Sequence, residues 1–276
     1  MRLVLGDRQY DLSTRALVMG IVNRTPDSFF DKGATYALDA LLARAEMLEA
    51  DGADLIDIGG VKAGPGPDVS EAEELDRVLP AIEALRARID IPISVDTWRA
   101  SVARAAYRAG AVLGNDISGF ADPGYLAAAA DAGATVVATH IRLAPRVRDP
   151  EPAYDDVLEV VRSFLVDRAA RATAAGIDPA RVILDAGLDL GKTPEQSLTL
   201  LRGSGALAKL GHPLLLSASN KTFLGAILDL DIDHRADASL AAAAIGVSLG
   251  CRIVRVHDVA RTRQVCDSIA AVLEAA

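Results

Sequence analysis

Eight short apolar runs recur along the chain, and each of them encloses or ends beside a polar or charged residue. A stretch with helical character follows almost every run. In a (β/α)8 barrel, eight parallel strands bring their C-terminal ends to one face, where the functional groups lie. The pattern therefore predicts an α/β protein with a TIM-barrel fold and a site at that face. The runs are 17–22, 55–58, 93–95, 112–113, 136–138, 182–184, 214–216 and 253–256.

The segments between the runs carry apolar residues at helical spacing. Ahead of the first run, Arg2 to Asp11 alternates apolar and polar residues around Gly6-Asp7, which predicts a hairpin that plugs the bottom of the barrel. No linker interrupts the series, so residues 1–276 are expected to form one domain. The expected helices are 37–50, 70–88 with a capping-box pattern at its start, 99–109, 125–132, 154–175, 194–207, a region between 221 and 249, and 261–276.

Charge and composition exclude several classes of protein. The net charge is −9 without any Lys/Arg-rich run, which argues against binding to nucleic acid or an anionic membrane. No apolar run is long enough to span a bilayer, and the N-terminus lacks a signal-peptide pattern, so a cytoplasmic location is expected. Cys251 and Cys266 lack CxxC spacing, which disfavours a disulfide framework or structural zinc.

Four polar residues at the ends of the runs are expected to converge in the barrel mouth: Asp96, Asn115, Asp185 and Lys221. A carboxylate accepts two hydrogen bonds from an NH2–C–NH edge, so this set suits a planar, nitrogen-rich heterocycle. Any single buried carboxylate is as readily explained as a partner of backbone amides or of a basic side chain. Four such groups at one face favour a ligand site.

A second group consists of Asn23, Arg255 and His257, which also stand at the ends of runs. A guanidinium, an imidazole and an amide together suit a phosphate or a metal-bound phosphate. The two groups jointly favour a bicyclic heterocycle that carries a pyrophosphate.

With these residues in place, the chain resembles the dihydropteroate synthase family over essentially its whole length. The family is a (β/α)8 transferase of folate biosynthesis, is the target of sulfonamides, and joins 6-hydroxymethyl-7,8-dihydropterin pyrophosphate to 4-aminobenzoate with Mg²⁺ on the pyrophosphate. The segments that carry the resemblance are Met19-Gly20-Ile21-Val22-Asn23, Thr25-Pro26-Asp27-Ser28-Phe29, Ile56-Asp57-Ile58-Gly59-Gly60, Ser94-Val95-Asp96-Thr97, Asn115-Asp116-Ile117-Ser118-Gly119, Leu184-Asp185 with Gly191-Lys192-Thr193, Ser219 with Lys221, and Arg255-Val256-His257-Asp258.

The resemblance assigns a role to each matching position. It implies that the pterin is held by Asp96, Asn115, Asp185 and Lys221, with Ser219 beside them, and that Asn23 binds Mg²⁺. Arg255 and His257 would hold the leaving pyrophosphate. Asp27 would shelter the cation that forms at the pterin methylene, so that Asp27, Lys221 and Arg255 would carry the catalysis.

Departures from the family pattern fall on the loops rather than on the strand ends. The family's Gly-Gly-Glu-Ser-Thr-Arg-Pro-Gly reads here Gly59-Gly60-Val61-Lys62-Ala63-Gly64-Pro65-Gly66, which removes the hydroxyls and the arginine. Asn220 replaces the arginine of Ser-Arg-Lys, and Asp189 and Leu190 replace Gly and Phe in the loop after the sixth strand. Each lost charge-assisted contact costs about 1.5 to 3 kcal/mol. Arg24 and Lys62 are candidates to restore part of the lost charge.

These observations favour a dihydropteroate-synthase-like protein that binds the pterin and whose synthase activity is weak or lost. An active synthase is the first alternative. A pterin-dependent methyltransferase is the second, although the retained segment 255–258 disfavours it.

Three further expectations concern single residues and the assembly. The near P-loop at 186–193 lacks its first glycine, and Lys192 or Lys221 is expected to bind a ligand or an anion rather than form a Schiff base. His140 is expected to contact phosphate or to be structural. The Ala-rich helices 239–249 and 261–276 offer close-packing surfaces for a homodimer.

Overall fold

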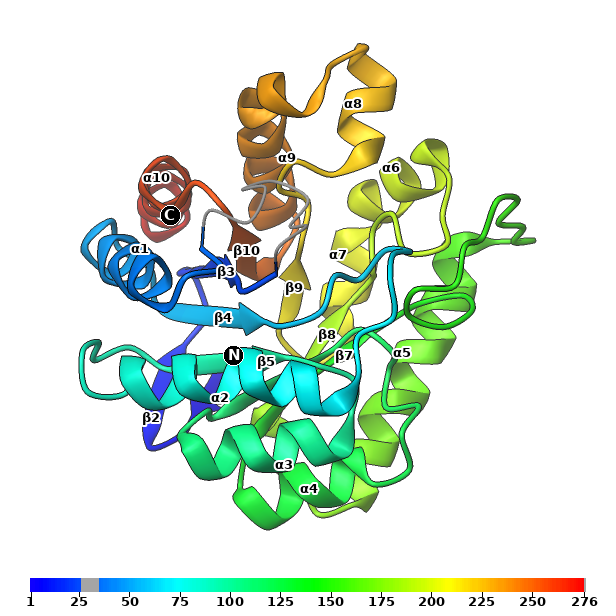
Figure 1. Cartoon of the computed structure of the whole chain (residues 1–276). Coiled ribbons are helices and arrows are strands. Elements are labelled where there is room, and N and C mark those ends of the chain that lie inside the picture. Colours follow the sequence, from blue (N-terminus) through cyan, green and yellow to red (C-terminus); the bar gives the residue numbers. More distant parts are fainter. Residues whose placement is uncertain (26–34, 276) are drawn as a thin grey trace.

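The computed structural model describes residues 1–25 and 35–275. Eight strands close into a barrel in which every neighbouring pair is parallel, and helices surround it (Figure 1). This confirms the TIM-barrel prediction. The strands are β3 (Leu17–Asn23), β4 (Leu55–Gly59), β5 (Ile93–Asp96), β6 (Leu113–Asp116), β7 (Thr135–Thr139), β8 (Val182–Asp185), β9 (Leu214–Leu216) and β10 (Cys251–Val256).

The N-terminal segment forms the predicted hairpin. Strand β1 (Arg2–Leu5) pairs antiparallel with β2 (Arg8–Asp11). Leu3, Leu5 and Leu12 are buried together with residues that point into the barrel from the strands. The Val4 carbonyl also accepts a hydrogen bond of 2.5 Å from the Thr135 hydroxyl on β7. The hairpin therefore closes the N-terminal end of the barrel.

Side-chain alternation divides the interior into two layers. Leu55, Leu113, Ile183 and Ile253 belong to the buried apolar cluster inside the barrel. Because successive side chains on a strand point to opposite faces, the residue two positions further along each strand also points inward, one layer higher. Those residues are Asp57, Asn115, Asp185 and Arg255. The strands thus place a polar layer directly above an apolar floor.

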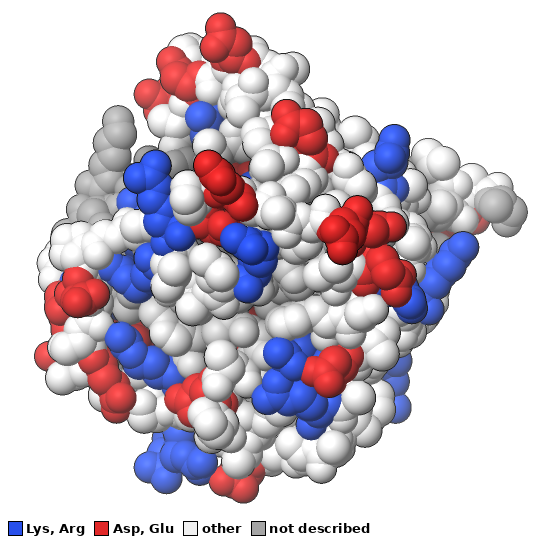
Figure 2. Space-filling model, turned by 90° about the vertical axis from the view of Figure 1, so that its right-hand side faces the viewer, with Lys and Arg blue, Asp and Glu red and all other residues white. Residues whose placement is uncertain are grey.

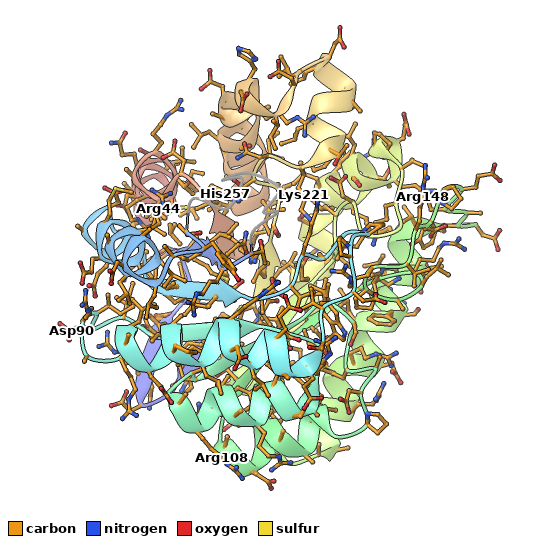
Figure 3. The ribbon with its side chains drawn as sticks, in the orientation of Figure 1. Arg44, Asp90, Arg108, Arg148, Lys221 and His257 are labelled. Carbon is orange, nitrogen blue, oxygen red and sulfur yellow. The ribbon has the colours of Figure 1, made fainter. Side chains whose placement is uncertain are left out.

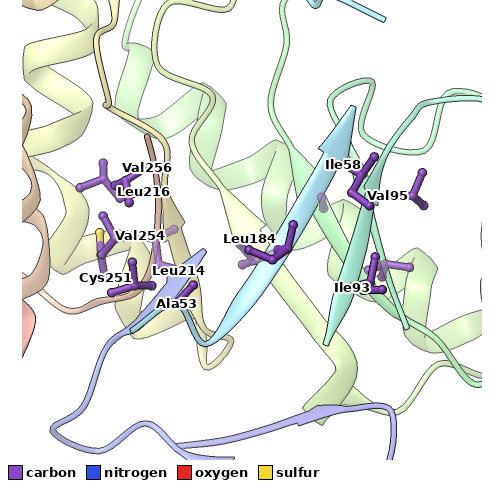
Figure 4. Close-up of a cluster of buried hydrophobic side chains, with 14 of the residues drawn as sticks. Ala53, Ile58, Ile93, Val95, Leu184, Leu214, Leu216, Cys251, Val254 and Val256 are labelled. Carbon is purple, nitrogen blue, oxygen red and sulfur yellow. The ribbon is translucent and has the colours of Figure 1, made fainter. Parts of the chain in front are cut away.

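The outward faces of the strands pack against the helices in a second apolar cluster. Figure 4 shows part of it, including Val254 and Leu216 on the paired strands β10 and β9, and Val95 on β5. Cys251 is buried in this cluster, and both cysteines are free thiols. No helix in the described ranges is long and apolar enough to cross a membrane.

Most helices lie where the sequence predicts them, and the differences concern their ends. Ser70 caps α2 (Glu71–Leu85) by accepting from the Glu73 amide, but the Glu73 side chain pairs with Arg77, so only half of the predicted capping box forms. Asp156 and Asp258 cap the fifth and last long helices at starts that differ from the predicted ones. The helices are α1 (Leu38–Ala50), α2 (Glu71–Leu85), α3 (Ala100–Ala109), α4 (Tyr125–Ala132), α5 (Val157–Ala174), α6 (Pro194–Arg202), α7 (Ser204–Leu207), α8 (Thr222–Leu228), α9 (Ala236–Ser248) and α10 (Val259–Glu274).

Candidate functional site

Arg255 is at the centre of the polar layer. Its Nε donates to Asp57 Oδ2 at 2.6 Å, and its Nη2 donates to Asp96 Oδ2 at 2.8 Å. Asp57 also accepts from Ser94 Oγ at 2.5 Å and from Asn115 Nδ2 at 3.1 Å. Side chains from β4, β5, β6 and β10 therefore form one hydrogen-bonded network, which we call the Arg255 network.

The Arg255 network holds two carboxylates and one guanidinium. Asp57 is fully buried, and the Asp96 and Arg255 side chains are 13% and 15% exposed. Burial raises the pKa of Asp96 to about 7; the Arg255 charge opposes the rise and the neighbouring Asp57 charge adds to it. The Asp96 carboxyl is therefore partly protonated near neutral pH.

Asp57 and Ser94 belong to the Arg255 network, and the site prediction did not include them. Asp57 lies within a predicted strand and two positions after the inward-facing Leu55, so its inward direction was readable from the alternation. Its pairing with Arg255, 198 positions away along the chain, required the closed barrel.

Asp185 and Lys221 lie on the neighbouring sector of the mouth. Asp185 Oδ1 accepts from the Gly187 amide at 2.8 Å. Burial raises the pKa of Asp185, while this hydrogen bond and the positive charges of Lys221 and Lys192 oppose the rise. Lys221 Nζ donates to the Leu188 carbonyl at 3.1 Å. The structure thus links Asp96 and Asn115 through the Arg255 network, whereas Asp185 bonds to its own loop and Lys221 lies beyond β9, at the start of α8.

Ser219 and His257 form a third contact at the mouth. Ser219 Oγ lies 3.0 Å from His257 Nδ1 and accepts from the His257 amide at 3.3 Å. Arg44 on α1 donates to the His257 carbonyl at 2.7 Å. Figure 3 shows Arg44 and His257 on adjacent elements, with Lys221 further along the mouth. A cavity of about 280 Å³ lies beside His257 and is lined by Arg44, Ser219 and Asn220 among others.

Asn23 is the predicted metal ligand. A Cβ added to Gly59 would lie 3.0 Å from Asn23 Oδ1 and 3.6 Å from Asp96 Cβ, so the amide oxygen faces the Asp96 side of the mouth. Residues 1–25 and 35–275 contain no cluster of three His, Cys, Asp or Glu side chains suited to a metal. A single amide oxygen fits Mg²⁺, which keeps several waters and takes phosphate oxygens. Asp27 lies outside the described residues.

Arg24, one of the two candidates for restoring the lost charge, contacts neighbouring backbone in this structure. Arg24 donates to the carbonyls of Tyr36 at 3.1 Å and of Arg77 at 2.9 Å, and so serves the contact between its loop and α2. Lys62 makes no side-chain hydrogen bond or ion pair with the described part of the chain.

Arg146 approaches the altered loop after β4 from the loop after β7. Its amide donates to the Ala63 carbonyl at 3.1 Å, and its guanidinium donates to the carbonyls of Lys62, at 3.1 Å, and Pro67. Sequence reasoning missed this residue, because nothing in either loop specifies the other. Arg146 has a positive φ of 67°, which marks a tightly determined turn.

Lys192 and His140 are structural rather than ligand-facing. Lys192 Nζ lies 3.0 Å from His140 Nδ1 and donates to the carbonyls of Gly187 and Leu190 at 2.8 and 3.0 Å. Burial lowers the pKa of Lys192 to about 7, against the opposing charge of Asp185. Burial together with Lys192 lowers the pKa of His140 to about 3, so its imidazole is neutral. Lys192 Nζ thus bonds to its own loop and to His140, which disfavours the P-loop role.

Basic and acidic side chains are interspersed on the face toward which β4 points, and no continuous basic field covers it (Figure 2). Any anionic ligand at this face must therefore be held by local groups such as those of the polar layer.

The fold and this polar layer define a class of protein. Residues 19–257 match the family described as pterin binding enzyme, and the chain belongs to that family.

Within that family the similar proteins are dihydropteroate synthases. The chain is 46% identical to the inactive dihydropteroate synthase 2 of Mycobacterium leprae, covering 94% of this chain and 91% of the relative. It is 43% identical to the dihydropteroate synthase of Synechocystis sp., covering 96% and 92%. One of these relatives is named inactive and the other is named a synthase. Similarity alone therefore does not decide whether this chain is active, and its individual residues must be considered.

Two solved structures agree in fold. The Yersinia pestis dihydropteroate synthase with a sulfonamide drug complex has a TM-score of 0.95 at 40% identity, over 100% of both chains. The Xanthomonas albilineans enzyme in complex with 7,8-dihydropteroate has a TM-score of 0.87 at 39% identity, over 99% of both.

Proposed function

We propose that this protein binds 6-hydroxymethyl-7,8-dihydropterin or its pyrophosphate in the barrel mouth and that its dihydropteroate synthase activity is weak or lost. The observation that carries the proposal is a contrast within the site. Asp96, Asn115 and Asp185 lie at strand ends, with Lys221 at the start of α8, whereas the loop after β4 lacks the Glu, Ser, Thr and Arg of the family pattern. The Mycobacterium leprae relative, named inactive, supports the same conclusion.

The polar layer offers acceptor oxygens to a ligand rich in N–H groups. Asn115 donates its amide nitrogen to Asp57, which leaves Asn115 Oδ1 as an acceptor. Asp185 uses Oδ1 for Gly187, which leaves Oδ2. A pterin presents an NH2–C–NH edge that matches such acceptors, and Lys221 supplies a donor for its carbonyl oxygen. A buried site that pairs these groups rejects ligands that leave them unpaired.

The anionic end of the ligand would meet Arg255 and His257, with Mg²⁺ held by Asn23 and the pyrophosphate. When bound, Mg²⁺ would neutralise charge on the leaving oxygens. In the synthase reaction the C–O bond to pyrophosphate breaks, the aniline nitrogen of 4-aminobenzoate forms a C–N bond to the methylene, and the nitrogen loses a proton. Arg255 would stabilise the departing charge through hydrogen bonds.

Reduced activity follows from the loops rather than from the layer. No side chain of residues 61–64 carries a guanidinium, and the Arg24 guanidinium donates to a backbone carbonyl of α2. Binding of the pterin depends on groups fixed by strands, but stabilisation of the transition state depends on groups that reach the leaving oxygens. The protein is therefore expected to retain affinity and to lose rate.

The test separates binding from turnover. Titration calorimetry with the pterin pyrophosphate and Mg²⁺ measures affinity, and chromatographic detection of dihydropteroate with 4-aminobenzoate measures rate. Asp185→Asn is the matched control, because it keeps the shape and removes the charge. We expect tight binding that this variant weakens, with little product. Turnover equal to that of an ordinary synthase would refute the loss of activity, and absence of pterin binding would refute the proposal as a whole.

Turnover at the ordinary rate would instead support the alternative, an active synthase, which the retained Arg255, His257 and Lys221 favour. The Synechocystis relative, named as a synthase, is consistent with that alternative.

We also propose a homodimer formed through helices remote from the mouth. Ile245 on α9 and Val272 and Leu273 on α10 are large apolar side chains that remain exposed, with Val272 at 74%. Apolar residues gathered on adjacent helices suit an isologous interface. Size-exclusion chromatography with light scattering tests this directly, and a monomer at high micromolar concentration would contradict it.

A further inference from the structure

The loop between β8 and α6, residues 186–193, is tied to the start of α8 at two adjacent points. Asp189 Oδ2 accepts from the Thr222 amide at 2.5 Å, and its Oδ1 accepts from the Phe223 amide at 3.2 Å. The preceding residue, Leu188, accepts from Lys221 Nζ at 3.1 Å. Two consecutive residues of one loop thus hold three consecutive residues of another. We call these contacts the Asp189 clasp.

The backbone conformation at Asp189 is one that favours glycine. Its φ is +67°, in the left-handed region where glycine is least strained, and the family pattern has glycine at this place. A side chain kept at such a position despite the backbone cost is expected to serve a purpose through its own contacts. The contacts of the Asp189 carboxylate are the two amides at the start of α8.

Hydrogen bonds from Lys192 and to Ser197 hold the loop that carries Asp189. Lys192 binds the carbonyls of Gly187 and Leu190, and the Asp189 amide donates to the Ser197 hydroxyl at 3.2 Å. Ser197 is fully buried on α6. These contacts hold the loop in place. The Asp189 clasp then fastens the start of α8, whose N-cap residue is Lys221, to this loop.

We propose that Asp189 is a positioning residue that acts through Lys221. Its carboxylate binds the two backbone amides that follow Lys221, and the Leu188 carbonyl accepts from the Lys221 ammonium. One loop therefore fixes the position of both the backbone and the ammonium group of Lys221. Because the Lys221 ammonium donates to the carbonyl of Leu188, three residues after Asp185, it lies on the Asp185 side of the mouth. The clasp thus presents a preformed donor to the pterin, and this role rests on the proposed pterin binding.

Three variants test the inference. Asp189→Gly removes the carboxylate and relieves the backbone, Asp189→Asn keeps an acceptor oxygen and tolerates positive φ, and Lys221→Met removes the ammonium. Pterin affinity is measured for each variant and for Asp189→Gly combined with Lys221→Met. We expect Asp189→Gly to weaken binding about three- to tenfold, as loss of one positioned hydrogen bond does, and Asp189→Asn to restore most of it.

The double variant identifies the route of the effect. If Asp189 acts through Lys221, the double variant binds no more weakly than Lys221→Met alone. Additive losses would overturn the inference, and so would unchanged affinity in Asp189→Gly.

A second measurement requires no ligand. Acetylation by acetic anhydride, followed by peptide mass spectrometry, reports the reactivity of the Lys221 amine, with the exposed Lys209 as internal control. Asp189→Gly is expected to raise Lys221 reactivity several-fold and to leave Lys209 unchanged. Equal Lys221 reactivity in the two proteins would overturn the clasp even if the wild-type protein bound no pterin, whereas failure of pterin binding alone would refute only the proposed function.

Discussion

The polar layer and the loops above it differ in how their residues are held. In the layer, side chains from separate strands bind one another, as Arg255 binds Asp57 and Asp96. In the loops, several side chains bind backbone groups instead, as Arg146 donates to the carbonyls of Lys62 and Pro67. A side-chain pair specifies both residues, but a carbonyl accepts from whatever residue the loop contains. The residues of a loop can therefore change while the loop keeps its position. Such changes can alter activity without removing the ligand site in the polar layer.

The largest effect that separates the two regions is expected from Arg255→Met. It keeps the volume but leaves Asp57 and Asp96 buried without their counter-charge, which typically costs about 3 to 5 kcal/mol of unfolding free energy. Urea denaturation measures the loss, and pterin binding should fall with it.

Arg261→Met is the control for that variant. Arg261 pairs with Asp237 on the surface, where such pairs contribute little, so its unfolding midpoint should hardly move. Equal midpoints for the two variants would show that the Arg255 network does not stabilise the layer.

The reverse experiment rebuilds the loop. Val61→Glu, Lys62→Ser, Ala63→Thr and Gly64→Arg together restore the family sequence, and a Cβ at Gly64 meets only Lys62 Cε, at 3.9 Å. Because a charge-assisted hydrogen bond contributes about 1.5 to 3 kcal/mol, dihydropteroate formation is expected to rise at least about tenfold.

Gly64→Met within the same rebuilt loop is the matched control, since it adds length without charge. A rebuilt loop that forms no more product than this control would show that the loss of rate lies elsewhere.

A smaller effect is expected from pH. The pKa of Asp96 is raised to about 7, so this carboxylate, which we expect to accept a hydrogen bond from the pterin, is mostly protonated below that value. Affinity should therefore increase as the pH rises from 5 to 7, by at most about tenfold per unit, and level off above 7. The same raised pKa lowers the stability of the folded state as the pH rises from about 4 to 7.

Asp96→Asn should flatten this pH profile of affinity, as measured by calorimetry at each pH. A profile that is already flat in the wild-type protein would indicate that Asp96 stays ionised beside Arg255.

The smallest effect is expected from Arg24→Leu. Because Arg24 serves α2 rather than the mouth, pterin affinity should stay within about twofold, and stability should fall by about 1 kcal/mol for the lost hydrogen bonds. A large loss of affinity would return Arg24 to the ligand site.

The sequence predicted what the strands determine. The period of two along β8 and β10 places Asp185 and Arg255 above the apolar floor, so the fold and the residue set of the mouth follow from local pattern. The sequence did not predict which other segments the loop side chains contact. Arg24 had a charge suited to phosphate, but nearby carbonyls of α2 engage it, and Arg146 reaches the altered loop only because the β7 and β4 ends share one face. These outcomes depend on distances between segments remote in sequence.

The hairpin at the bottom of the barrel limits how ligands exchange. Leu3, Leu5 and Leu12 fill the end opposite the mouth, so molecules that reach the polar layer arrive and depart on the same side. A heterocycle seated against Asp185 then lies beneath anything bound closer to the loops. If a pterin binds there as proposed, a second molecule bound above it would have to arrive after it and leave before it.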